Sequence, residues 1–175
     1  MKSMVNAFGE YAKPTLIQSK PVALNRLIED VLLLYPSASG IEFELHLEPQ
    51  LPSVQADPVK LRQVMHNLIK NAQEAMPSGQ SGRITIKSNV LPNTDPPMVA
   101  IRISDNGPGV PSDQIDRIFE PYVTHKTKGT GLGLAIVRRI IEETGGSIKV
   151  DPLYEGGASF VLTLPVAQIQ GSSPS

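Results

Sequence analysis

Two asparagines four residues apart, Asn67 and Asn71, stand inside the segment LRQVMHNLIKNAQEAM. The apolar spacing of this segment predicts an amphipathic helix, on which residues four apart share one face. Asparagine costs about half a kcal/mol relative to alanine inside a helix, because its amide competes for backbone hydrogen bonds. The pair could be two solvated amides without a role, or their oxygens could serve a hard cation such as Mg²⁺.

A carboxylate followed by two glycines, in ISDNGPGVP, is the second candidate. Asp105 ends an apolar strand pattern, so we expect its side chain at a partly buried end of the sheet. Asp-Asn-Gly alone is an ordinary turn sequence. The second glycine, Gly109, would also let a planar group approach the backbone closely. A carboxylate fixed there could accept a hydrogen bond from an exocyclic amine.

Alternate glycines open the last predicted helix, in KTKGTGLGL. The free amides around Gly129, Gly131 and Gly133, at the positive end of the helix dipole, would form an anion site. They could equally be a flexible start of a helix, since the spacing is not that of the Rossmann fingerprint and no Walker lysine follows. Lys126 and Lys128 could add positive charge or be solvated loop lysines. Together, the three candidates predict a site for a nucleotide with Mg²⁺.

The surrounding pattern predicts the elements that must position these groups. Hairpin-connected strands with helices between them indicate an α+β fold: a two-layer α/β sandwich whose mixed, mostly antiparallel sheet is covered on one face by about three helices. A short helical piece is also expected at 112–119. The predicted helices span 24–36, 58–76 and 131–146, and the predicted strands span 41–48, 54–57, 82–90, 97–105, 147–152 and 158–165. Residues 1–13 resemble the end of a helix, 14–166 form the domain, and 167–175 have the composition of a disordered tail.

Composition excludes several classes of protein. The 175 residues carry 16 basic and 17 acidic side chains, so no net field favours nucleic acid or anionic lipid. The absence of cysteine excludes disulfides and thiolate zinc sites. No apolar run reaches the ~18 residues of a membrane span, and the start lacks the apolar core of a signal peptide. The histidines His46, His66 and His125 lack metal or triad partners at useful spacing. We therefore expect a cytoplasmic domain that contacts neither nucleic acid nor membrane.

Four motifs resemble, in order and spacing, the asparagine, first-glycine, phenylalanine and second-glycine boxes of sensor histidine kinases. They are NLIKNAQEA, DNGPGV, IFEPYVTHKTKGTGLGLAIV and GGASFVLTLP, and the resemblance covers about residues 20–165. Those kinases belong to a superfamily with gyrase, the Hsp90 chaperones and MutL, which implies the Bergerat-type ATP-binding fold. The NAQEAM ending, the compact lid and MVNAFGEYAKP look closest to nitrogen-regulation sensor kinases of the NtrB/NtrY type.

The resemblance implies a role for each motif. Asn71 and Asn67 would handle Mg²⁺ and the phosphates, and with Lys126, near the γ-phosphate, they would form the catalytic set. Asp105 would accept a hydrogen bond from the adenine amine. A mobile lid would run from about Gly109 to Gly129. The full set of implied nucleotide contacts is Asn67, Asn71, Asp105, Gly107, Gly109, Phe119 as the lid anchor, Lys126, Gly129, Thr130, Gly131, Leu132, Gly133, Leu134 and Thr163.

The sequence departs from the family pattern in two places. Glu74 and Ala75 stand where many histidine kinases have a basic residue and an aromatic one, so stacking on the base is not predicted there. No histidine has the phosphoacceptor setting, in which an acidic residue follows and a proline lies nearby. The histidine would therefore lie on a dimerisation hairpin absent from this chain. We expect the chain to be monomeric, the parent to be a homodimer, and the chain alone not to phosphorylate itself.

The function implied is transfer of the γ-phosphoryl of Mg-ATP to that histidine, for relay to a response regulator. A clamp ATPase of the gyrase type is one alternative, but such enzymes have a glutamate base where Asn67 stands, and an amide cannot take a proton from water. The chain could also be a non-catalytic nucleotide-binding module, or a protein-serine kinase of the anti-sigma type.

Overall fold

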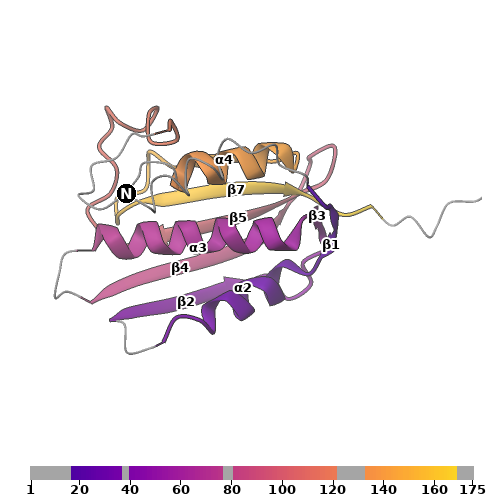
Figure 1. The fold of residues 1–175 in the computed structure, drawn as a ribbon, viewed down its shortest axis with the longest axis horizontal. Helices are drawn as coiled ribbons and strands as arrows, with labels where there is room; N and C mark the ends of the chain where they lie inside the picture. The colour runs from indigo at the N-terminus through magenta and orange to yellow at the C-terminus, as the bar shows by residue number, and fades with distance from the viewer. Residues whose placement is uncertain (1–16, 37–39, 77–80, 122–132, 169–175) are drawn as a thin grey trace, which may run out of the picture.

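The computed structural model of the chain describes residues 17–36, 40–76, 81–121 and 133–168. The elements follow the predicted order, with one further short strand at the start (Figure 1). They are β1 (Lys20–Val22), α2 (Leu24–Leu32), β2 (Ile41–Leu47), β3 (Val54–Ala56), α3 (Pro58–Ala75), β4 (Gly82–Leu91), β5 (Met98–Asp105), α4 (Gly133–Glu143), β6 (Ser147–Val150) and β7 (Ser159–Pro165).

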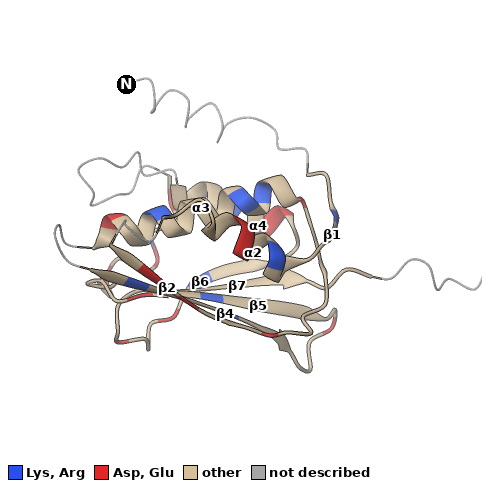
Figure 2. Cartoon of the chain, turned by 90° about the horizontal axis from the view of Figure 1, so that it is seen from below, with Lys and Arg blue, Asp and Glu red and all other residues tan. Residues whose placement is uncertain are grey.

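Five strands form one sheet in the order β2-β4-β5-β7-β6, and β1 pairs with β3 in a separate two-stranded sheet. Only the β2–β4 pair of the larger sheet is parallel. Helices α2, α3 and α4 gather on one side of this sheet, and its other face is open (Figure 2). The predicted α+β sandwich, with a mixed and mostly antiparallel sheet, is confirmed.

The core lies between the helices and the inner sheet face, and strand alternation decides which residues enter it. On β5, Val99, Ile101 and Ile103 are buried against the helices, whereas Arg102 between them belongs to the open face. Burial of each such side chain contributes about 1.5–3 kcal/mol. The central strands and α3 are therefore a rigid base for whatever their ends carry.

The start of α3 is fixed as the sequence predicts. Asp57 is the N-cap, and its carboxylate accepts hydrogen bonds from the amides of Val59 at 2.9 Å and Lys60 at 3.3 Å. Pro58 occupies the first helical position, where its missing N–H costs nothing. Because the cap sets the phase of the helix, it also sets the face on which the two asparagines lie.

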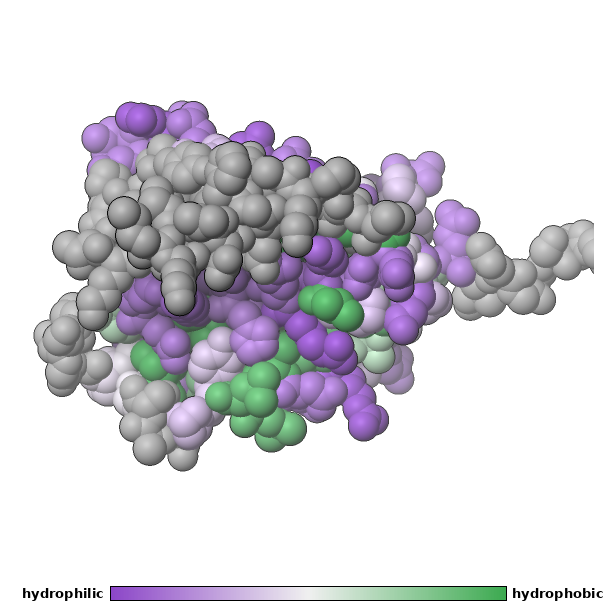
Figure 3. All heavy atoms as spheres, in the orientation of Figure 1, coloured by the Kyte–Doolittle hydropathy of each residue, from purple (hydrophilic) through white to green (hydrophobic). Residues whose placement is uncertain are grey.

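Several local expectations were wrong. α2 ends at Leu32 and not at residue 36, and Leu34, which would have packed with the buried apolar residues of the helix, is 68% exposed. Hydrophobic atoms are visible on the surface in this region (Figure 3). Residues 112–119 form consecutive turns and not a helix. β1 was not predicted, because Pro21 suggested a link. Finally, the Ala167 amide bonds to the Ser53 carbonyl at 2.8 Å, so ordered pairing extends past the expected boundary at 166.

His66 of α3 lies beside an aromatic residue that follows α2. The ring of His66 is half-buried and lies beside Tyr35, with 2.8 Å between its Nδ1 and the tyrosine hydroxyl. Burial raises the pKa of Tyr35, so this hydroxyl stays protonated at neutral pH.

Among the described residues, none of the helices has the length and apolar character needed to cross a bilayer.

Candidate functional site

Asp105 accepts hydrogen bonds from two backbone amides. It ends β5 on the helix-facing side of the sheet and is 4% exposed. Its Oδ1 accepts hydrogen bonds from the amides of Gly107 at 2.9 Å and Ala158 at 3.1 Å. Its own amide donates to the Ala158 carbonyl at 2.9 Å. The carboxylate is buried, as predicted, and its orientation is set by the turn after β5 and by the loop before β7.

The turn after Asp105 is tied to the neighbouring strand. The Asn106 amide donates to the Arg83 carbonyl at 3.2 Å, and the Asn106 side-chain oxygen accepts from the Arg83 amide at 2.8 Å. These bonds continue the β4–β5 pairing one residue past the strand. The Asp-Asn-Gly sequence is thus an ordered turn, and Asn106 holds it to β4 directly beside Asp105.

The glycines of this turn allow it to pack closely against neighbouring backbone. Gly109 has φ +83°, and a Cβ there would lie 3.0 Å from the Gly157 carbonyl oxygen. A Cβ at Gly107 would lie 3.2 Å from Asp105 Oδ1 and 3.5 Å from the carbonyl oxygen of Ala75, at the end of α3. The turn therefore lies between the end of α3 and the loop that precedes β7.

Gly157, in the loop before β7, is a closely packed position that the sequence analysis did not single out. Its φ is +151°, and a Cβ at this position would overlap the main-chain oxygen of Asp105 and lie 2.7 Å from Oδ1. In the same loop, the Tyr154 hydroxyl donates to that main-chain oxygen at 3.4 Å. The sequence signal was a small-residue pair directly before a strand that pairs with β5.

The asparagines lie where α3 meets α4. Both are half-buried, and the Asn67 side-chain amide donates to the carbonyl oxygen of Gly133, the first residue of α4, at 3.3 Å. Asn71 is one turn closer to the Asp105 end of the helix. From Asn67 to Ala75 the helix rises by roughly 12 Å, a distance that a nucleoside triphosphate can span.

Phe119 and Leu134 contribute to the packing around the site. The ring of Phe119 packs edge-on against Phe160 of β7, with 6.1 Å between the ring centroids. Leu134 is half-buried against the core. The segment after the Asp105 turn is therefore attached to the sheet at Phe119.

Thr163 is not part of this site, contrary to the prediction. It pairs with Ala100, five positions along β5 from Asp105, which corresponds to roughly 17 Å. Its neighbours Leu162 and Leu164 are buried, so alternation places Thr163 on the open face. There its hydroxyl bonds to the amide and the hydroxyl of Ser147. The predicted contacts Lys126, Gly129, Thr130, Gly131 and Leu132, and also His125, lie outside the described residues.

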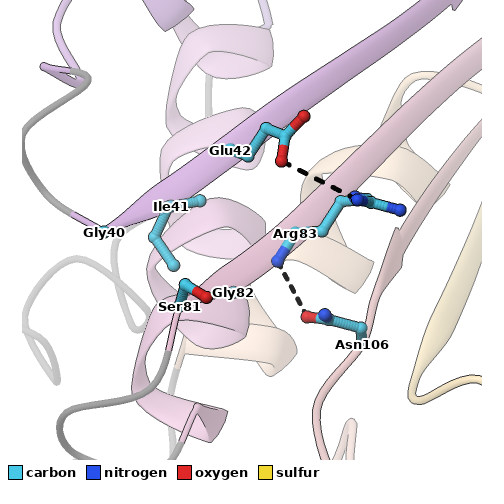
Figure 4. A pocket seen from close by; sticks show the side chains of 7 residues that line it. All are labelled: Gly40, Ile41, Glu42, Ser81, Gly82, Arg83 and Asn106. Carbon is cyan, nitrogen blue, oxygen red and sulfur yellow. Dashed lines mark hydrogen bonds and ion pairs between the residues drawn. The ribbon is translucent and has the colours of Figure 1, made fainter.

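A cavity of about 290 Å³ lies at the end of the sheet beyond this site (Figure 4). Two of the residues that line it, Arg83 and Glu42, form an ion pair with 3.8 Å between guanidinium nitrogen and carboxylate oxygen. Its lining consists of Gly40, Ile41, Glu42, Ser81, Gly82, Arg83 and Asn106. Asp105, Asn67 and Asn71 do not line it, and the cavity adjoins the candidate site through Asn106 of the Asp105 turn.

The donor set of the site suits magnesium better than a transition metal. The described residues contain no group of three or more His, Cys, Asp or Glu side chains able to hold a metal. Amide oxygens such as those of Asn67 and Asn71 are hard ligands, and Mg²⁺ keeps most of its waters and needs few protein ligands.

Comparison with known proteins gives the family. The family described as "Histidine kinase-, DNA gyrase B-, and HSP90-like ATPase" matches residues 56–168, and the chain belongs to it. Sensor histidine kinase ZraS of Escherichia coli (strain K12) is 40% identical over 169 residues, 95% of this chain. The chain spans about a third of ZraS, 35% of its length. The chain is an ATP-binding catalytic domain of the sensor histidine kinase kind.

Two solved structures are similar in fold. Full-length ShkA in complex with AMPPNP superposes with a TM-score of 0.79 at 30% identity, covering 95% of this chain and 36% of that one. Histidine kinase ThkA in complex with the response regulator protein TrrA gives a TM-score of 0.78 at 30% identity, covering 95% and 47%. These relatives do not show the closeness to nitrogen-regulation kinases that is expected from the sequence.

Proposed function

We propose that this chain is the part of a sensor kinase that binds Mg-ATP and presents its γ-phosphoryl group to a histidine on a separate hairpin domain. The observation that carries the proposal is the buried Asp105 carboxylate, fixed by the amides of Gly107 and Ala158. A carboxylate fixed in this way is an acceptor of defined direction, which suits the amine of adenine. Gly107 and Gly109 would shape the pocket for the flat ring beside it.

The middle of α3 would supply the phosphate and metal contacts. Donation from the Asn67 amide group to Gly133 ties α3 to the first residue of α4, where the helix dipole and free amides favour an anion. The oxygens of Asn67 and Asn71 would hold Mg²⁺. Lys126 and the amides from Gly129 to Leu134 complete the proposed contacts to phosphate.

The chemistry assigned to these residues is positioning and charge neutralisation. Mg²⁺, when bound, offsets the charge of the phosphates, while the amides of the α4 end hold them in line for an incoming imidazole. Asn67 cannot act as a general base because an amide does not take up a proton near neutral pH. We therefore favour transfer to a histidine over hydrolysis by a clamp ATPase.

The partners follow from the same proposal. The acceptor histidine lies on a dimerisation hairpin, of which residues 1–13 would be the end, and the phosphoryl group passes to a response regulator. The solved complex of ThkA with TrrA supports such a partner. We further propose a homodimeric parent, a cytoplasmic position for this domain, where ATP is available, and kinship with the NtrB/NtrY type.

A reconstituted transfer reaction tests the proposal. The chain is mixed with Mg-ATP labelled at the γ position and with a separately prepared hairpin domain from the same parent. We expect label on the hairpin, lost in acid and stable in base as for phosphohistidine, and none on the chain alone. Asn71→Ala should abolish transfer.

Three outcomes of this reaction would contradict the proposal. Stoichiometric self-labelling of the chain would show that it contains its own acceptor. Rapid release of inorganic phosphate without transfer would favour a clamp ATPase. Acid-stable label on a serine would favour a protein-serine kinase.

A further inference from the structure

The loop that covers Asp105 is anchored on the opposite face of the sheet. Arg102 alternates with the buried Ile101 and Ile103, so its side chain belongs to the open face. One of its guanidinium nitrogens donates to the Asp151 carboxylate at 2.8 Å and to the Ser159 hydroxyl at 3.0 Å. Asp151 follows β6 and Ser159 begins β7. Arg102 therefore holds both ends of the loop between these strands.

The two ends of the loop are also bonded to each other and to the sheet. The Asp151 amide donates to the Ser159 carbonyl at 2.8 Å, and the second carboxylate oxygen of Asp151 accepts from the Leu153 amide at 2.9 Å. Ser159 is fully buried, and its hydroxyl lies 2.8 Å from that of Ser104. The Leu153 amide and then the Arg102 guanidinium hold the pKa of Asp151 below its usual range, so this carboxylate is charged at neutral pH.

From this anchor the loop reaches Asp105 directly. Ala158, next to Ser159, donates its amide to Asp105 Oδ1 at 3.1 Å. Gly157 lies against the Asp105 main chain, and the Tyr154 hydroxyl donates to the Asp105 carbonyl at 3.4 Å. A shift of the loop would therefore move one of the two amides that orient the Asp105 carboxylate.

We propose that Arg102 and Asp151 are positioning residues for adenine recognition: their ion pair on the open face places the Ala158 amide, and through it orients the Asp105 carboxylate. Neither residue would touch the nucleotide, which binds on the helix side of the sheet. The inference rests on the proposed function of Asp105 and adds a second layer of residues to it. An exposed ion pair without this connection contributes little to stability.

The discriminating measurement compares ATP with inosine triphosphate. The two share sugar and phosphates, but inosine carries a carbonyl oxygen where adenine carries its amine, so only ATP presents an amine donor at that position to Asp105. Affinities for both are measured by calorimetry in the unsubstituted chain, in Arg102→Met and in Asp151→Asn. We expect Arg102→Met to weaken ATP binding about fivefold and inosine triphosphate binding by less than about twofold. Asp151→Asn should act in the same direction, but less strongly.

Two control variants accompany the test. Arg138→Met removes an ion pair of similar length, 3.0 Å to Glu142 on α4, and should leave the preference for ATP unchanged. Arg102→Lys keeps the charge beside Asp151 and should recover part of the preference. Asp151→Asn keeps an oxygen acceptor for the Leu153 amide, so it carries the test if thermal melting shows that Arg102→Met does not fold.

The outcomes separate this inference from the proposed function. Equal weakening of both nucleotides, or no change in either, would overturn the positioning role and leave the network with a structural role. Absence of any preference for ATP in the unsubstituted chain would overturn the base-reading role of Asp105 itself, and the positioning role with it.

Discussion

The two ends of the site are built in different ways. At the Asp105 end, hydrogen bonds from β4, β5 and the loop before β7 converge on one carboxylate and its turn, and most of the donors are backbone amides. At the other end, the polar contact that ties α3 to α4 comes from a side chain: the Asn67 amide donates to the Gly133 carbonyl at 3.3 Å.

This difference indicates how the two ends would work. A carboxylate held by backbone amides needs no ligand to take its orientation, so the base end is formed before binding. The side-chain oxygens of Asn67 and Asn71, by contrast, would contact Mg²⁺ only when it arrives with the phosphates. We therefore expect the base end to act independently of metal and the phosphate end to depend on it.

The largest effect is expected from a substitution at Gly157, which packs directly against the main chain of Asp105. Gly157→Ala would place a methyl group against the Asp105 main-chain oxygen at a φ that other residues rarely adopt. Strain and overpacking together should cost about 3 kcal/mol of unfolding free energy. Urea denaturation measures this, and nucleotide binding should be lost as well.

Gly133→Ala is the matched control for that substitution. A Cβ at Gly133 would meet no heavy atom within 4 Å, and alanine favours the helix that begins there. Its stability should equal or slightly exceed that of the unsubstituted chain. Equal stability of Gly157→Ala and Gly133→Ala would contradict the close packing described around Asp105.

Asp105→Asn should weaken ATP binding without unfolding the chain. Asparagine can keep an oxygen toward the amides of Gly107 and Ala158, but its NH₂ group would face the adenine amine, donor against donor. A lost charged hydrogen bond costs about 1.5–3 kcal/mol, or roughly 10- to 100-fold in affinity. Calorimetry with an unfolding curve as control measures both properties. Unchanged affinity in a folded variant would place the base elsewhere.

Asn71→Ala should produce a smaller loss of affinity that appears only with metal. We expect ATP binding in Mg²⁺ to weaken about tenfold, the effect of one charge-assisted contact, and binding in EDTA to stay within about twofold. Equal weakening under both conditions would contradict a role for Asn71 toward the cation.

The sequence indicated the candidate-site residues whose types are unfavourable for the helix or strand that carries them. Two asparagines inside a helix and an aspartate at the end of an apolar strand are costly unless they serve something, and both signals are visible within a few residues. Gly157 was missed because the atom that excludes a side chain there belongs to Asp105, far away in the chain. Thr163 was misplaced because strand register and face come from pairing with β5, which a single strand does not show.

The fold was predictable for a similar reason. Period-two and helical patterns identified all but one of the described elements, since burial on one face determines both. The exact ends of the helices and the shortest strand were not predictable. β1 exists because Val22 is buried and the strand pairs with β3, and Leu34 is exposed because α2 ends before it.

The smallest predicted effect concerns Asp151 and pH. Because its pKa is lowered in the folded state from 3.8, its charge stabilises the chain at higher pH, and this stabilisation is lost as the pH falls through the folded pKa. The difference in stability between the unsubstituted chain and Asp151→Asn should therefore be largest near neutrality. It should shrink below about pH 4, as followed by urea unfolding. A difference that is constant down to about pH 2 would show that the charge of Asp151 has no part in it.

The most direct test of the two-ended site is a pair of calorimetric titrations, with ATP and with adenosine, each in Mg²⁺ and in EDTA. Adenosine contacts only the base end, so its affinity should be the same under both conditions. ATP contacts both ends, and we expect EDTA to weaken its binding by about tenfold or more. ATP binding of equal strength with and without metal would contradict the account, as would adenosine binding that requires Mg²⁺.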